Sequence, residues 1–85
     1  MKIFFTAGFA KKFSKMPVGI QRQFEERVEI FRADSGNPVL KAHPLKGNLA
    51  GLRAFSVSGD YRVIYRLLDS NNVELVSIGK HSQVY

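Results

Sequence analysis

The spacing of the apolar residues changes partway along the chain, and this change limits the folds open to it. In the first half they recur at helical spacing, as Phe9, Phe13 and Met16 and then as Ile20, Phe24, Val28 and Phe31. Each set forms one apolar stripe along a helix, with Lys, Glu and Arg on the other faces. From Arg53 onward apolar and polar residues alternate, which is the spacing of β-strands. We therefore expect an α+β fold, with helices first and a sheet after them.

Prolines, glycines and capping residues predict where the elements begin and end. A strand is expected over residues 2–6, a helix that ends at Pro17, a second helix that ends near residue 35, and a surface loop over residues 37–52. Three strands are expected over residues 53–58, 61–68 and 73–79, separated by two turns. The sequence thus predicts a single domain over residues 1–85. In it, an N-terminal strand and a two-helix hairpin pack on one face of an antiparallel sheet of about four strands.

Strand alternation assigns the expected faces of this sheet. The residues predicted to pack on the helices are Phe55, Val57, Val63, Tyr65 and Leu67. The residues left on the opposite face are Ala54, Ser56, Ser58, Arg62 and Arg66. That second face is expected to carry small side chains and basic ones.

The overall charge points to polyanionic partners. Thirteen Lys and Arg against seven Asp and Glu give a formal net charge of +6. Such a surface attracts nucleic acid or an acidic protein. The absence of cysteine excludes disulfides and thiolate metal sites and is compatible with a reducing cytoplasm. Neither a leader peptide nor a membrane span is expected at the start, because Lys11 and Lys12 interrupt the apolar run.

Several kinds of catalysis are disfavoured by the residues present. The two histidines and the acids form no metal-ligand spacing, so we expect no metal and no other cofactor. Neither a nucleophile-elbow motif nor a glycine-rich phosphate loop occurs. RNA cleavage by the substrate's own 2′-hydroxyl needs only a base, an acid and positive charge. Histidine and arginine supply these, so His43, His81 and Arg62 are of the right types.

The second half also resembles a known family. The segments HPLKG at residues 43–47, GxR at 51–53, GDYRVIY at 59–65 and GKHSQVY at 79–85 are similar, in the same order, to the RelE/ParE toxin superfamily and especially to its YafQ-like branch. The resemblance implies a RelE-like fold with helices on one face of the sheet and an RNA groove on the other. It also implies a cytoplasmic toxin that cleaves messenger RNA in the ribosomal A site and is inhibited by a cognate antitoxin.

The resemblance further implies roles for individual residues. Those that match catalytic positions are His43, Asp60, Arg62, His81 and Tyr85. Those expected to contact RNA are Lys46, Arg53, Tyr61 and Arg66. One departure concerns Ser56, which stands where YafQ-like toxins can carry another histidine. This chain therefore has one fewer candidate for proton transfer.

Other interpretations of the same residues stay open. On the same scaffold, a ParE-like toxin binds DNA gyrase and does not cut RNA, and a non-catalytic homologue would keep only the basic face. Taken alone, His43 could anchor its loop and Asp60 could bond its own turn. Arg62 and Arg66 could simply form a solvated strand face.

Overall fold

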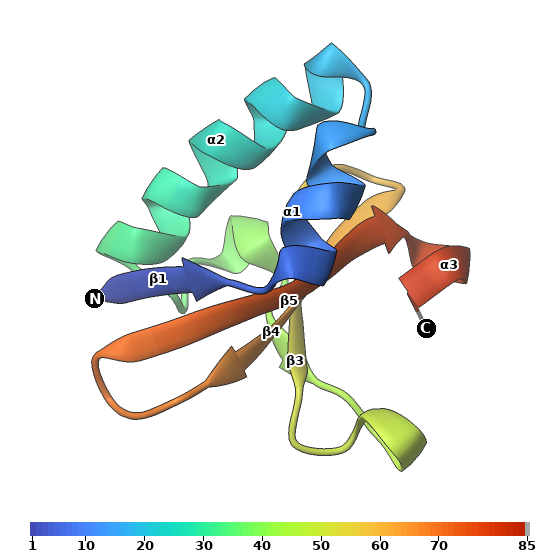
Figure 1. Ribbon diagram of the computed structural model, residues 1–85. Coiled ribbons are helices and arrows are strands. Elements are labelled where there is room, and N and C mark those ends of the chain that lie inside the picture. Colours follow the sequence, from blue (N-terminus) through green and yellow to red (C-terminus); the bar gives the residue numbers. More distant parts are fainter. Residues whose placement is uncertain (85) are drawn as a thin grey trace.

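The computed structural model describes residues 1–84, apart from the side chain of Gln83. Within these residues the elements are β1 (Lys2–Phe5), α1 (Ala7–Ser14), α2 (Val18–Ala33), η1 (Pro38–Leu40), β2 (His43–Pro44), η2 (Gly47–Leu49), β3 (Arg53–Ser56), β4 (Tyr61–Leu67), β5 (Asn72–Lys80) and α3 (His81–Val84). Helices α1 and α2 lie together on one side of the sheet (Figure 1). None of the described helices is long and apolar enough to cross a membrane. The predicted α+β architecture is confirmed.

The sheet differs in two respects from the predicted one. Among the described residues it has five strands in the order β1-β5-β4-β3-β2. The extra strand is β2, two residues inside the segment predicted to be a loop. The pairs β3–β4 and β4–β5 are antiparallel as expected, and the unexpected strand β2 also pairs antiparallel with β3, but β1 runs parallel to β5, with Lys2 opposite Asn72. A strand that pairs with a segment so distant in the sequence has no connecting turn to fix its direction.

Thr6 forms the junction between β1 and α1. Its Oγ1 accepts a hydrogen bond from the backbone N–H of Phe9 at 2.9 Å, which caps the first turn of α1. The same hydroxyl donates to the carbonyl of Val76 in β5 at 3.1 Å. The Thr6 side chain therefore caps the start of α1 and also bonds it to β5.

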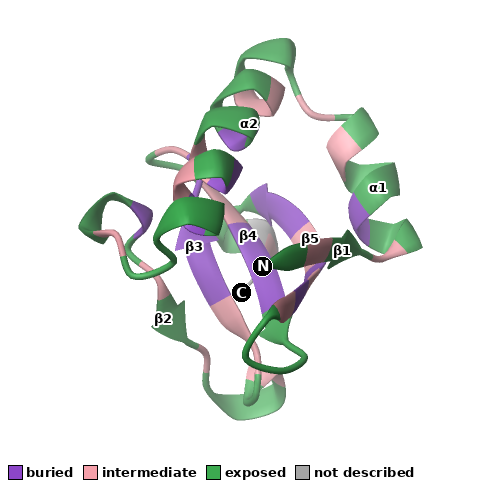
Figure 2. Ribbon diagram, turned by 90° about the vertical axis from the view of Figure 1, so that its left-hand side faces the viewer, coloured by how far each residue is buried: buried purple, intermediate pink, exposed green. Residues whose placement is uncertain are grey.

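The core lies between the two helices and the strands (Figure 2). Phe31 of α2 packs on Phe55 and Tyr65, with ring centroids 4.9 and 5.0 Å apart. Phe55, Val57, Val63 and Tyr65 are all buried, as their alternation predicts. The helical stripe is confirmed as well, because Phe9, Phe24, Val28 and Phe31 are buried and Phe13, Met16 and Ile20 pack against them.

One residue of the face assignment is wrong, and the second face is more buried than the alternation alone indicates. Leu67, expected in the core, is 55% exposed, because it is the last residue of β4 and the helices do not cover the strand there. The opposite face is not open at its centre, since Ala54, Ser56 and Ile64 are 0%, 5% and 3% exposed. Alternation gives the side of the sheet on which a residue lies, whereas burial also depends on what covers that side.

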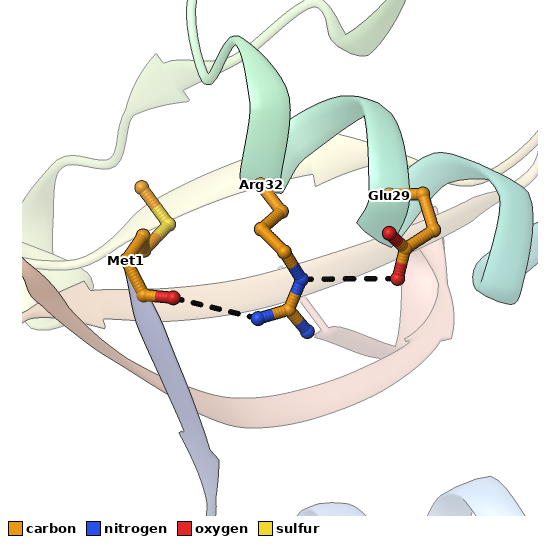
Figure 3. Close-up of polar contacts among 3 residues, drawn as sticks. All are labelled: Met1, Glu29 and Arg32. Carbon is orange, nitrogen blue, oxygen red and sulfur yellow. Dashed lines mark hydrogen bonds and ion pairs between the residues drawn. The ribbon is translucent and has the colours of Figure 1, made fainter.

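Arg32, near the end of α2, connects the helix to the start of β1 (Figure 3). Its Nη1 donates to the carbonyl of Met1 at 3.4 Å, and its Nε lies 3.7 Å from Oε1 of Glu29. Both side chains of this ion pair are well exposed, at 46% and 70%. Such a contact contributes little to stability.

The contrast between Leu75 and Leu67 gives a test of the fold. Leu75 is 0% exposed, so Leu75→Ala removes core contacts and should lower the free energy of unfolding by roughly 2–5 kcal/mol. Leu67→Ala, on the adjacent strand, should change it by less than about 0.5 kcal/mol. Urea unfolding followed by circular dichroism measures both values. Equal losses in the two variants would contradict this account of the core.

Asp69 makes stability depend on pH. Its carboxylate accepts hydrogen bonds from the Asn72 side chain at 3.0 and 2.8 Å and from the Asn71 N–H at 2.8 Å. The Asn72 contact first, and then the Asn71 N–H, lowers the pKa of Asp69 below its ordinary value of 3.8. A lowered folded-state pKa contributes stability above the unfolded value, and this contribution is lost as the pH falls through the folded value.

We therefore expect Asp69→Asn to be less stable than the unaltered protein at about pH 6, because asparagine keeps an acceptor but lacks the charge. The difference should shrink below about pH 4 as the native carboxylate becomes protonated. Urea unfolding of the two proteins across this range measures it. A difference that stays constant down to about pH 2 would rule out the Asp69 contribution.

Candidate active site

The pairing of β4 with β5 brings three of the predicted catalytic residues together. The backbone N–H of His81 donates to the carbonyl of Asp60 at 2.7 Å. Two residues further along β4, Arg62 lies opposite Gly79, which has no side chain to obstruct it. Asp60 and His81 are both exposed, and Arg62 is half-buried. Asp60, Arg62 and His81 thus lie close together where β4 starts and β5 ends, at one end of two central strands of the sheet.

The guanidinium of Arg62 is held by the turn that precedes β4. Its Nη1 donates to the carbonyls of Ser58 at 2.8 Å, Gly59 at 3.1 Å and Tyr61 at 3.1 Å. None of the hydrogen bonds described for Arg62 uses Nε or Nη2. A guanidinium has donors on all three nitrogens, so one nitrogen can anchor the group while the others meet an anion.

Ser56 lies directly opposite Arg62 on β3 and is the one polar residue buried among those described. Its hydroxyl donates to the carbonyl of Ser58 at 2.8 Å, so that carbonyl accepts from both Ser56 and Arg62. Ser56, at the position where the resemblance allows a histidine, therefore helps to hold the turn. Sequence reasoning missed this use of Ser58 and Gly59, because backbone carbonyls leave no signal in residue types.

His43 lies on β2, further across the same face of the sheet. It is paired with Ala54, which is two residues before Ser56 on β3. Two strand spacings, roughly 10 Å, separate β2 from the strand that carries Arg62. Nδ1 of His43 lies 3.0 Å from the carbonyl of Lys41. A carbonyl can only accept, so Nδ1 carries the hydrogen, and in the neutral ring the lone pair is on Nε2, as a general base requires.

Two of the predicted RNA contacts lie on the face that packs against the helices. Arg53 is opposite Tyr65, and its Nε donates to the Tyr65 hydroxyl at 3.2 Å. Tyr61 has the same alternation as Val63 and is partly buried against the core. Neither side chain shares a face of the sheet with Arg62, so the structure does not bring these two residues to the site.

The other predicted RNA contacts are exposed but apart from each other. Lys46 precedes the short helix η2, in a loop closed by a hydrogen bond from Leu45 N to Leu52 O of 2.9 Å. Arg66 is four residues beyond Arg62 on β4, which corresponds to about 13 Å along the strand. It lies opposite Glu74 of β5. Tyr85, predicted to be catalytic, lies outside the described residues.

These groups are suited to proton transfer and to the binding of a phosphate. Imidazoles exchange protons near neutral pH, and a fixed guanidinium stabilises charge that develops on phosphate oxygens. Within residues 1–84, no three His, Cys, Asp or Glu side chains converge so that they could hold a metal ion.

The comparisons with known structures agree on the fold. A mutant of the YafQ toxin from E. coli superposes with a TM-score of 0.80 at 18% identity, covering 99% of this chain and 97% of that one. A YoeB/ParE toxin from Agrobacterium tumefaciens gives 0.78 at 19% identity, covering 95% and 99%. YafQ in the E. coli DinJ-YafQ complex gives 0.72 at 20% identity, covering 99% and 97%.

The sequence comparison identifies the family. No curated protein matches the chain. Residues 3–85, however, match the family model described as the ParE toxin of the type II toxin-antitoxin system, parDE. Because this match covers nearly the whole chain, the protein belongs to the ParE toxin family of type II toxin-antitoxin systems, within the RelE/ParE superfamily that its second half resembles.

Proposed function

We propose that this toxin is a ribosome-dependent endoribonuclease that cleaves messenger RNA in the ribosomal A site, in the cytoplasm. The observation that carries the proposal is the pairing of Asp60 with His81 next to the anchored guanidinium of Arg62. An inhibitor that only binds another protein does not require an acid–base group beside a fixed phosphate-binding group. The similar folds of YafQ and YoeB toxins support the same proposal.

In the proposed reaction, the scissile phosphate lies over β3 and β4, between His43 on one side and Arg62 and His81 on the other. One histidine removes the proton from the 2′-hydroxyl, whose oxygen then attacks the adjacent phosphorus. The other histidine gives a proton to the departing 5′-oxygen. Arg62 keeps Nη1 on the turn and offers its remaining donors to the phosphorane oxygens. Asp60 orients its neighbour His81.

The remaining predicted residues are assigned to binding the RNA. Lys46 and Arg66 are exposed cations that meet the RNA backbone on either side of the site. Tyr85 is assigned to positioning or stacking on the RNA. We leave Arg53 and Tyr61 out of the RNA contact, because both lie on the face packed against the helices.

We also propose that a cognate antitoxin binds this surface. The E. coli DinJ-YafQ structure is described as a toxin-antitoxin complex, and the YoeB-YefM structure from Staphylococcus aureus likewise. The net charge of +6 favours an acidic, partly disordered partner that folds on the toxin and neutralises it.

A second candidate function is inhibition of DNA gyrase without RNA cleavage. The observation in its favour is the family match, since the matched model is described as the ParE toxin. A non-catalytic homologue that only binds RNA or a partner is the third alternative.

The test is primer extension on a message in a translating extract, with and without ribosomes. The unaltered toxin should produce cuts at codon-phased positions only when ribosomes are present. His81→Ala should slow cleavage by about 10²–10⁴-fold and Arg62→Ala by about 10²–10³-fold, because these variants lose a proton-transfer group and phosphorane stabilisation respectively. Arg22→Ala removes one exposed charge from α2 and serves as the control, with an unchanged rate.

The outcomes separate the candidates. Equal cleavage by the unaltered protein, His81→Ala and Arg62→Ala would refute the mechanism. Intact message together with accumulated cleaved DNA complexes in expressing cells would establish gyrase inhibition instead. Intact message without DNA damage would favour the non-catalytic homologue.

A further inference from the structure

We infer that Arg27 of α2, which lies outside the proposed site, is a positioning residue that holds the two halves of the site together. The inference rests on the proposed ribonuclease function. Its basis is the geometry of one guanidinium nitrogen. Nη1 of Arg27 donates to the carbonyl of Val39 at 3.0 Å and to the carbonyl of Ser56 at 3.1 Å.

The two carbonyls belong to two different segments of the chain, and one nitrogen of Arg27 bonds to both. Val39 is in the short helix η1, and Ser56 is the last residue of β3. Strand β2 pairs only with the first two residues of β3 and ends before Ser56. Because β2 does not extend alongside Ser56, Arg27 supplies the donor for the Ser56 carbonyl. A charged donor makes a stronger bond here than a neutral one.

Each of the two segments leads directly to part of the site. From Val39 the chain reaches Lys41, whose carbonyl meets the Nδ1 of His43. From Ser56 the hydroxyl bonds the Ser58 carbonyl, which also accepts from Arg62. A short covalent and hydrogen-bonded path thus runs from Arg27 to His43 on one side and to Arg62 on the other.

The location of Arg27 excludes direct contact with RNA bound over the second face. Arg27 belongs to α2, which packs on the helix-facing side of the sheet, whereas the proposed RNA lies over the second face (Figure 1). Any effect of Arg27 on the cleavage rate must therefore act through the positions of His43 and Arg62. A displacement of about 1 Å between reacting groups can slow a reaction by as much as about 100-fold. Loss of the contact should consequently lower kcat and leave the binding of the ribosome-bound message, reported by KM, unchanged.

The experiment compares three variants in single-site cleavage of ribosome-bound message. Arg27→Gln should lower kcat by about 10–100-fold, with KM within about twofold. Arg27→Lys should recover part of the rate, because one ammonium nitrogen has three donors and can reach the same carbonyls. Arg32→Gln is the matched control, since Arg32 is on the same helix and donates to the carbonyl of Met1, at the other edge of the sheet (Figure 3). Its rate should equal that of the unaltered protein.

A second measurement does not depend on activity. In nuclear magnetic resonance spectra, Arg27→Gln should shift the imidazole signals of His43 and the backbone amide signals of residues 57–62, and Arg32→Gln should leave them in place. Circular dichroism gives the folded fraction by which each rate is divided.

The results distinguish the two proposals. If the unaltered protein cuts no message, the ribonuclease function fails, and the spectra still decide whether Arg27 positions these segments. If it cuts and Arg27→Gln cuts equally fast, the function stands and the role of Arg27 is refuted. A loss of rate that merely follows the folded fraction, without recovery in Arg27→Lys, also refutes positioning. Unchanged spectra in Arg27→Gln refute it as well.

Discussion

The antiparallel register between β4 and β5 is the constraint on which the rest of the molecule depends. It sets Val63 against Ile78 inside the core, and by the same alternation it sets Arg62 against Gly79 on the other face. A shift of one residue would turn every one of these side chains to the wrong side of the sheet. Stability and the arrangement of the site are therefore specified by the same set of backbone hydrogen bonds.

Much of this fold can be predicted because its signals are local. The stripe that ends in Phe31 and the alternation through Phe55 and Val63 each need only a short window of sequence. The failures are positions where the outcome depends on distant parts of the chain. Leu67 has the right alternation but extends past the helices, and β1 has the right composition but no local indication that its partner is β5 or that the two strands are parallel.

The candidate site likewise has some features that the sequence predicts and others that depend on distant parts of the chain. The motifs around Asp60 and His81 identify residues that the structure brings into contact, and alternation places Arg62 on the correct face. Residue types cannot show that Arg62 is bound to backbone carbonyls. Neither can they show that Arg27, which lies among glutamates on α2, reaches across to β3. Such contacts depend on tertiary geometry, and an arginine of this kind looks in the sequence like any solvated helix residue.

The parallel pairing of β1 with β5 also governs when the protein can fold. Lys2 to Phe5 lie next to Asn72 to Leu75, so each residue of the first strand pairs with one made 70 positions later. At typical rates of synthesis this interval lasts roughly 4–14 s. Until then Thr6 has no Val76 carbonyl to bond, and the apolar face of α1 has no β5 to cover. A newly made chain therefore cannot close its sheet until β5 has been translated, so folding of the sheet must wait for this distant segment.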